Sequence, residues 1–270
     1  MSNGYADLGN GKVYYEIEGK GETLVLIHAG FVDSGMWDGQ WQALTRYWRV
    51  LRFDMRGFGK SDPSTGPVSR RHDLYRLLKE LGIGNAHLLG CSIGGETAID
   101  FTLEHPEMVL SLTVVSGIPG GFEMRGEPPS EILEMLQALE EGDLDRVNDL
   151  QVRLWVDGPF RQPEDVSQSV RQHAAEMNRT AVRNGTWAIA DASPLNPPNP
   201  PAAVRLAEIN IPVLIIAGSL DNPELLRAAD FLADGINGAK KVIMPDSAHV
   251  PNMEKPEEFN KIVLDFLNRA

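Results

Sequence analysis

A serine flanked by glycines lies in a Gly-x-Ser-x-Gly run that spans residues 90–94, and this spacing suits nucleophilic chemistry. An apolar stretch over residues 86–91 precedes the serine, and a helical pattern follows it. A serine at the tip of such a sharp strand-to-helix turn has a strained backbone, and Gly90 and Gly94 leave room for it. We therefore expect Ser92 to project its hydroxyl above a sheet. The run is short enough to occur by chance, so its meaning depends on what accompanies it.

A serine needs a base that takes its proton and a carboxylate that orients the base. Asp221 follows a strand-like stretch at residues 211–217, and His249 follows another at residues 240–244. In an open α/β sheet, loops after parallel strands gather at the carboxyl edge, where ligands bind. The order serine, aspartate, histidine therefore predicts a catalytic triad of Ser92, His249 and Asp221.

Other residues compete for these roles. Asp246 is nearer to His249 in sequence but lies on the same loop, so it is less able to reach the far ring nitrogen. Asp221 could also cap the helix that begins at Pro223, a role that is compatible with the first. His28 ends a strand, but we expect it to shape the adjacent loop. The remaining histidines lie on helices or at the wrong strand ends: His72, His87, His105 and His173.

Acyl transfer also needs backbone N–H donors aimed at the oxygen on which negative charge develops. The N–H of Ile93 directly follows the serine, at a helix N-terminus that favours such charge. A second donor should come from the loop after the strand at residues 24–27, and Gly30 is the candidate. Gly30 could instead serve only to turn the chain.

Alternating strands and helices must position these groups. Residues 24–27, 50–53, 86–91 and 110–115 read as buried strands, with helices between them. This rhythm predicts a parallel sheet with right-handed crossovers. It stops at Gly117 and resumes near residue 211 with two more strands and a final amphipathic helix at residues 256–267.

The stretch between these two parts reads differently. Residues 119–205 contain helical patterns at 130–141, 144–156 and 164–178, no convincing strand, and a proline-rich end. We therefore expect a core domain of residues 1–118 and 206–270, with residues 119–205 forming a helical cap insertion. The proline-rich end reads as a stiff return segment, because proline at this density suits neither helix nor central strand.

Composition narrows the class of protein. The formal net charge of −13 and pI near 4.9 disfavour nucleic acid and anionic membranes as partners, since both need basic patches. Cys91 is the single cysteine, which excludes an internal disulfide; we expect it to be a small buried residue rather than a redox group. No metal-ligand spacing, signal peptide or membrane-spanning run is visible. We expect a cytoplasmic enzyme without metal or organic cofactor. The sequence does not decide between a monomer and a homodimer.

The combined motifs resemble those of the α/β-hydrolase superfamily over essentially the whole chain. They are His28-Ala29-Gly30-Phe31, the loop Asp54-x-Arg56-Gly57-x-Gly59-x-Ser61, the serine turn, Asp221, and His249-x-x-x-x-Glu254-x-Pro256. The resemblance implies an eight-stranded, mostly parallel sheet flanked by helices, a helical cap between strands six and seven, and a triad of Ser92, His249 and Asp221. The family usually has His-Gly where this chain has His28-Ala29. Members with an aspartate nucleophile, such as haloalkane dehalogenases, are excluded by Ser92.

Within this superfamily the chain is most similar to small esterases and enol-lactone hydrolases. We expect a serine hydrolase that cleaves small carboxylic esters or lactones through an acyl-enzyme. Aromatic and apolar side chains are expected to line its pocket: Phe31, Trp155, Trp187 and Val250. Asp54 and Arg56 are expected to form a structural ion pair beside the site. Alternatives with the same triad are a carbon–carbon bond hydrolase acting on vinylogous diketones and a cofactor-free perhydrolase; a ligand receptor is a more distant rival.

Overall fold

A single eight-stranded sheet forms the centre of the computed structural model, which describes residues 2–270. The strand order is β1-β2-β4-β3-β5-β6-β7-β8. The pairs β1·β2 and β2·β4 are antiparallel, and the other neighbours are parallel. The strands are β1 Ser2–Asp7, β2 Lys12–Glu18, β3 Thr23–Ile27, β4 Arg49–Phe53, β5 Ala86–Cys91, β6 Val109–Val115, β7 Val213–Gly218 and β8 Lys240–Met244. The expected eight-stranded, mostly parallel sheet is confirmed.

The central strands are apolar along their whole length because both faces of the sheet are covered. Every residue of β3, β5 and β7 is buried. Alternate side chains enter different cores: Val25 and Ile27 lie in one cluster, and Leu24 and Leu26 lie in the other. The sequence prediction placed the start of β7 at residue 211, but the strand begins at Val213, after a proline that has no N–H to donate to a ladder.

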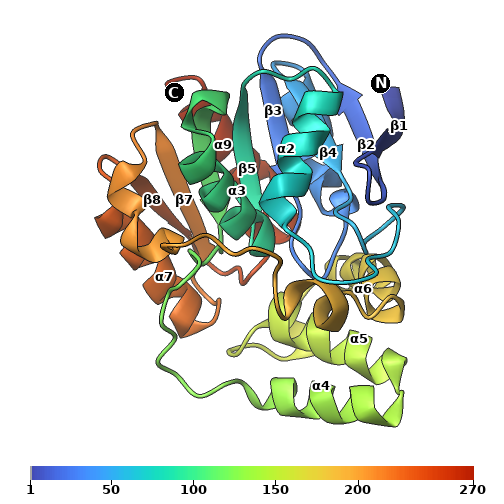
Figure 1. The fold of residues 1–270 in the computed structure, drawn as a ribbon. Helices are drawn as coiled ribbons and strands as arrows, with labels where there is room; N and C mark the ends of the chain where they lie inside the picture. The colour runs from blue at the N-terminus through green and yellow to red at the C-terminus, as the bar shows by residue number, and fades with distance from the viewer. Residues whose placement is uncertain (1) are drawn as a thin grey trace.

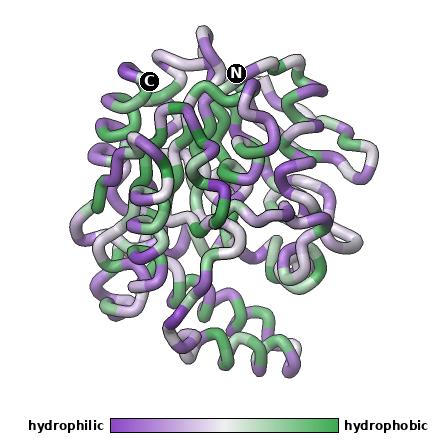
Figure 2. The backbone as a smooth tube through the Cα atoms, turned by 60° about the vertical axis from the view of Figure 1, so that its left-hand side comes forward, coloured by the Kyte–Doolittle hydropathy of each residue, from purple (hydrophilic) through white to green (hydrophobic). Residues whose placement is uncertain are grey.

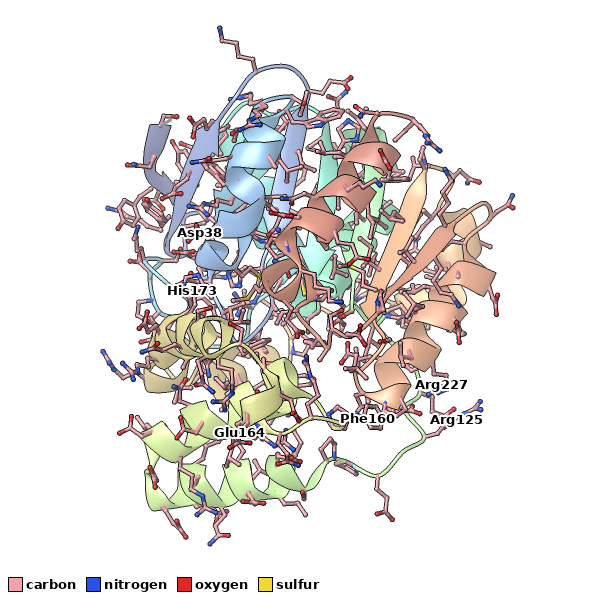
Figure 3. All side chains as sticks on the ribbon, turned by 180° about the vertical axis from the view of Figure 1, so that it is seen from behind. Asp38, Arg125, Phe160, Glu164, His173 and Arg227 are labelled. Carbon is pink, nitrogen blue, oxygen red and sulfur yellow. The ribbon has the colours of Figure 1, made fainter. Side chains whose placement is uncertain are left out.

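Helices cover the two faces. The front layer of Figure 1 contains α2 (Arg70–Glu80), α3 (Ile93–Glu104) and α7 (Pro223–Gly235). The opposite layer, which faces the viewer in Figure 3, contains α1 (Asp38–Thr45) and α9 (Pro256–Leu267). A short helix, α8 (Pro251–Glu254), precedes α9. Leucines of α2 fill the first core, and aromatic side chains of α1 and α9 fill the second.

Three further helices lie between β6 and β7 in the chain: α4 (Ser130–Glu141), α5 (Leu144–Val152) and α6 (Gln168–Arg183). They lie below the sheet in Figure 1, whereas both termini lie above it. In Figure 2 the lowest helices alternate between hydrophobic and hydrophilic residues, as amphipathic helices do. They enclose a small core of their own around Met135, Ala138, Val147 and Val182. The helix predicted at residues 164–178 in fact begins at Gln168 and continues to Arg183.

Buried ion pairs tie these helices to each other and to the core. Asp157 is fully buried and accepts a 2.7 Å hydrogen bond from Arg171 on α6. The Arg161 guanidinium lies 2.6 Å from Glu254 on α8. At the surface, His173 on α6 lies 3.8 Å from Asp38 at the start of α1, and both residues are labelled in Figure 3. Because removing one partner of a buried pair leaves an uncompensated charge, the Arg161–Glu254 pair opposes separation of the inserted helices from the core.

The expected helical character of residues 119–205 agrees with the described structure, which contains no strand in this range. No helix within residues 2–270 combines the length and apolar character needed to cross a membrane.

Candidate active site

Ser92 lies at the turn between β5 and α3, with φ 54° and ψ −118°. This positive φ is costly for a residue with a Cβ atom, so the surrounding backbone must hold it in place. A Cβ on Gly90 would lie 2.1 Å from the carbonyl oxygen of Gly94, and a Cβ on Gly94 would lie 2.4 Å from the carbonyl oxygen of Ile27. Both glycines are therefore required by close backbone contact, as the sequence pattern predicts.

Two backbone N–H groups lie beside the serine. Ile93 is the first residue of α3, and Gly30 follows β3. A Cβ on Gly30 would lie 3.3 Å from the Ile93 side chain, so the two residues are close neighbours. Neither N–H donates to another group within residues 2–270. Both are thus free to bind an oxygen that acquires negative charge.

His249 and Asp221 meet on the loops after β8 and β7. The Nδ1 atom of His249 lies 3.0 Å from Oδ2 and 3.3 Å from Oδ1 of Asp221, and both side chains are almost completely buried. This carboxylate holds the proton on Nδ1 and leaves Nε2 as the basic nitrogen. Nε2 of His249 has no hydrogen-bond partner in the described part of the chain. The competing Asp246 is exposed and lies 3.6 Å from Lys255 instead.

Aromatic rings surround the His249 imidazole. The ring of Trp155 lies 4.7 Å from it, centroid to centroid, and the ring of Phe31 lies 6.3 Å from it. Phe31 and Trp155 also stack on each other at 6.3 Å. Trp155 belongs to a π-helical turn, Arg153–Asp157, and Trp187 begins another, Trp187–Asp191. Such turns shift side chains away from the regular helical face and are common at functional sites.

A cavity of about 410 Å³ contains these groups. Ser92, His249, Gly30 and Ile93 line it from the sheet side. The other lining residues are Phe31, Glu96, Ser116, Ile118, Met124, Ile132, Met135, Gln151, Leu154, Trp155, Trp187, Asp191 and Leu225. The wall of the cavity is therefore largely apolar, and the polar groups that could react with a carbonyl substrate lie at its base.

Of the four residues expected to line the pocket, three do so and Val250 does not. Phe31, Trp155 and Trp187 line the cavity, and Trp187 is 49% exposed. Val250 is fully buried in the core on the α1 and α9 face, at the residue that precedes α8. His249 and Val250 are neighbours on this loop, yet His249 faces the cavity and Val250 faces the core.

Two acidic residues were not anticipated from the sequence: Glu96 and Asp191 both line the cavity. Glu96 lies four residues after Ser92 and so occupies the same face of α3, a spacing that could have revealed it. Asp191 lies in the inserted segment and forms a two-pronged ion pair with Arg70 at 2.9 and 3.0 Å. Its position depends on how the inserted helices pack on α2, which no local pattern specifies.

The loop residues near the site act structurally, but the expected ion pair between Asp54 and Arg56 is wrong. Asp54 instead accepts backbone hydrogen bonds from Ser34 and Lys60 at 2.9 and 2.8 Å. Arg56 pairs with Asp73 on α2 at 2.7 Å. A Cβ on Gly59 would overlap the Asp54 carboxylate, so this carboxylate fills the turn.

His28 connects two loops beneath the cavity. Its Nδ1 lies 2.8 Å from the carbonyl oxygen of Ala29, and its Nε2 accepts a 2.9 Å hydrogen bond from the N–H of Met55. Accepting at Nε2 requires the neutral imidazole. Complete burial lowers the pKa of His28 to about 4, although Asp54 acts in the opposite direction. His28 thus shapes the Gly30 loop, as expected.

A pH dependence of stability follows from His28. Unfolded His28 takes up a proton near its ordinary pKa of 6.5, whereas the folded imidazole stays neutral down to about 4. The stability that its neutral form contributes is therefore present above pH 6.5 and is lost as the pH falls toward 4. Over this window the advantage of wild type over His28→Asn should shrink by about 3 kcal/mol, measured by urea unfolding. The exposed His72→Asn variant is the control; an equal pH trend in both variants would contradict the assignment.

Within residues 2–270 no group of three or more His, Cys, Asp or Glu side chains is arranged to hold a metal ion. Cys91 is buried behind the serine turn, and burial raises the pKa of its thiol. It therefore packs as a small apolar side chain.

The chain is similar to known proteins over nearly its whole length. A family model described as alpha/beta hydrolase fold matches residues 22–256. A 2-hydroxy-6-oxononadienedioate/2-hydroxy-6-oxononatrienedioate hydrolase from Klebsiella pneumoniae is 31% identical, over 98% of this chain and 90% of that protein. A 2-hydroxy-6-oxo-6-phenylhexa-2,4-dienoate hydrolase from Comamonas testosteroni is 27% identical, over 97% and 93%. The enol-lactonase structure from Burkholderia xenovorans LB400 is 26% identical, with a TM-score of 0.80, over 98% of this chain and all of that one.

Proposed function

Because this chain belongs to the alpha/beta hydrolase family, we propose that it hydrolyses a small ester or lactone through an acyl-enzyme on Ser92. One observation carries the proposal. The strained Ser92 and the unpartnered Nε2 of His249 line one cavity, and Asp221 holds the other nitrogen of that histidine. Nucleophile, base and orienting carboxylate thus come from the loops after β5, β8 and β7.

The first half of the reaction forms the acyl-enzyme. Ser92 Oγ attacks the carbonyl carbon while Nε2 of His249 takes the hydroxyl proton. The carbonyl oxygen becomes an anion and accepts hydrogen bonds from the N–H groups of Gly30 and Ile93. Collapse of this intermediate breaks the bond to the leaving alcohol, to which His249 returns the proton. Asp221 stabilises the transient imidazolium without itself taking the proton.

The second half releases the acid. Water attacks the acyl carbon, His249 takes one proton of that water, and the same two N–H groups bind the new oxyanion. Collapse then frees the carboxylic acid and returns the proton to Ser92. The largely apolar wall formed by Trp155, Phe31 and Leu154 limits competing water around the imidazole.

Carbon–carbon bond hydrolysis is the second candidate, and the names of the curated relatives support it better than they support ester hydrolysis. The same triad could serve it. The cavity disfavours an anionic substrate, because no lysine or arginine is among its lining residues, whereas Glu96 and Asp191 are. A dienoate carries a carboxylate, which an ionised Glu96 would repel, whereas the charge of Asp191 is balanced by Arg70.

A substrate panel distinguishes the two candidates. We expect kcat/KM for a short-chain para-nitrophenyl ester and for a small lactone to exceed that for 2-hydroxy-6-oxo-6-phenylhexa-2,4-dienoate by about tenfold or more. This factor corresponds to about one unfavourable contact between like charges at an effective dielectric constant of about 20. Absorbance assays at equal enzyme concentration measure all three reactions. The reverse order would replace the ester proposal with carbon–carbon bond hydrolysis.

A further inference from the structure

A second cavity of about 370 Å³ adjoins the one that contains Ser92. The two cavities share Ile93, Glu96 and Asp191 as lining residues. The second cavity extends along α2 and α3 to the proline-rich end of the inserted segment, where Pro194, Pro197, Pro198 and Pro201 close it. A substrate whose carbonyl lies at Ser92 can therefore extend past Glu96 into this space.

Two carboxyl groups on α3 face this second cavity without a cation of their own. The N–H of Glu96 donates to the carbonyl oxygen of Ser92, but the Glu96 carboxyl group forms no hydrogen bond or ion pair within residues 2–270. Asp100 is only 9% exposed, and its Oδ1 has no hydrogen-bond partner in the described structure. The spacing of four residues places both on the same face of the helix. A buried, unpartnered carboxylate is costly, so a donor or a cation in the cavity would stabilise this pair.

The arginines in the same wall have other partners. Arg70 is held by Asp191, and Arg71 by Glu104 at 2.6 Å and by the carbonyl oxygen of Asn196. Burial, together with the nearby charges of Asp100 and Asp191, raises the pKa of Glu96 to about 7. Burial raises the pKa of Asp100 to about 6, with Glu104 adding to the effect and with Arg71 and Arg205 opposing it. The negative charge near Glu96 is therefore only partly balanced by these arginines.

We propose that the second cavity binds a protonated amine of the substrate between Glu96 and Asp100. The inference rests on the proposed function and narrows it to esters or lactones that carry an ammonium group away from the reacting carbonyl. An ammonium donates up to three hydrogen bonds and so can serve both carboxylates at once. A carboxylate in the same position would meet two like charges.

Three para-nitrophenyl esters of similar length test this subsite: the ε-aminocaproate, the uncharged heptanoate and the adipate monoester. At about pH 8, where Glu96 is ionised and the amine is protonated, we expect kcat/KM for the amino ester to exceed that for the heptanoate by about tenfold or more. The adipate monoester should be the poorest. The preference should reside mainly in KM, and it should weaken toward about pH 6 as Glu96 takes up a proton.

Glu96→Gln and Asp100→Asn keep the shape of each side chain and remove its charge. Each should lower the ratio of kcat/KM between the amino ester and the heptanoate, and Glu96→Gln should bring it close to one. Glu107→Gln, an exposed carboxyl just beyond α3, is the matched control and should keep the wild-type ratio. The heptanoate rate tests the proposed hydrolase function separately. Hydrolysis of the heptanoate without preference for the amino ester, or a preference that survives in both variants, would overturn the amine subsite.

Discussion

Replacing Ser92 with alanine is expected to lower kcat/KM for a para-nitrophenyl ester by about 10⁴-fold. The change removes one oxygen and leaves the cavity, His249 and the two free N–H groups in place. A residual rate above that in water should persist, because the Gly30 and Ile93 N–H groups can still stabilise an oxyanion formed by water attack. The measurement is initial-rate kinetics with wild-type and variant protein at equal concentration.

Controls separate loss of the nucleophile from loss of the fold. Ser92→Ala should keep the wild-type circular dichroism spectrum and a similar melting temperature, since alanine occupies the same backbone conformation. Ser169→Ala on α6, whose hydroxyl bonds only with Ser167 at 2.9 Å, should retain full activity. Mass spectrometry after rapid quenching should detect an acyl adduct on wild type and none on the Ser92 variant. Near-normal ester hydrolysis by the variant would rule out the proposed mechanism.

The serine turn could be predicted from the sequence because its determinants are local. A buried strand ends at Cys91, a helix begins at Ile93, and two glycines remove atoms that would otherwise overlap neighbouring backbone. The same holds for Asp221 and His249, since each lies on the loop after a parallel strand and all such loops share one edge of the sheet. Where alternation of strand and helix is strong, residue order is enough to bring distant groups together.

Features that depend on packing between segments could not be predicted in this way. Arg56 pairs with Asp73 rather than Asp54, because the Asp54 carboxylate is already committed to backbone donors. Trp155 lies over His249 because a π-helical turn, which has no clear sequence signature, sets its direction. Val250 is adjacent to the histidine in sequence and yet faces the core. Chain adjacency predicts which loop a residue belongs to but not which side of that loop it faces.

Gly94→Ala should be among the most destabilising single-atom changes in this chain. The added Cβ would lie 2.4 Å from the carbonyl oxygen of Ile27 and 2.6 Å from that of His28, so the end of β3 would have to move. Alanine favours a helix over glycine by about 1 kcal/mol, which works in the opposite direction. Overpacking against backbone commonly costs 1–3 kcal/mol and here has no flexible side chain to absorb it, so a net loss of about 2–3 kcal/mol is expected.

The same displacement should reach the chemistry, because Gly30 follows β3 by three residues and its N–H must stay aimed at the oxyanion. We therefore expect Gly94→Ala to lower kcat by about 10²-fold in whatever fraction of the protein remains folded, as for the loss of one oxyanion donor. Gly84→Ala is the matched control: nothing lies within 4 Å of its added Cβ, and both unfolding free energy and kcat should stay near wild type. If Gly94→Ala unfolded in urea at the wild-type midpoint, the serine turn would not depend on this close backbone contact. Other contacts would then have to hold Ser92 in its strained backbone conformation.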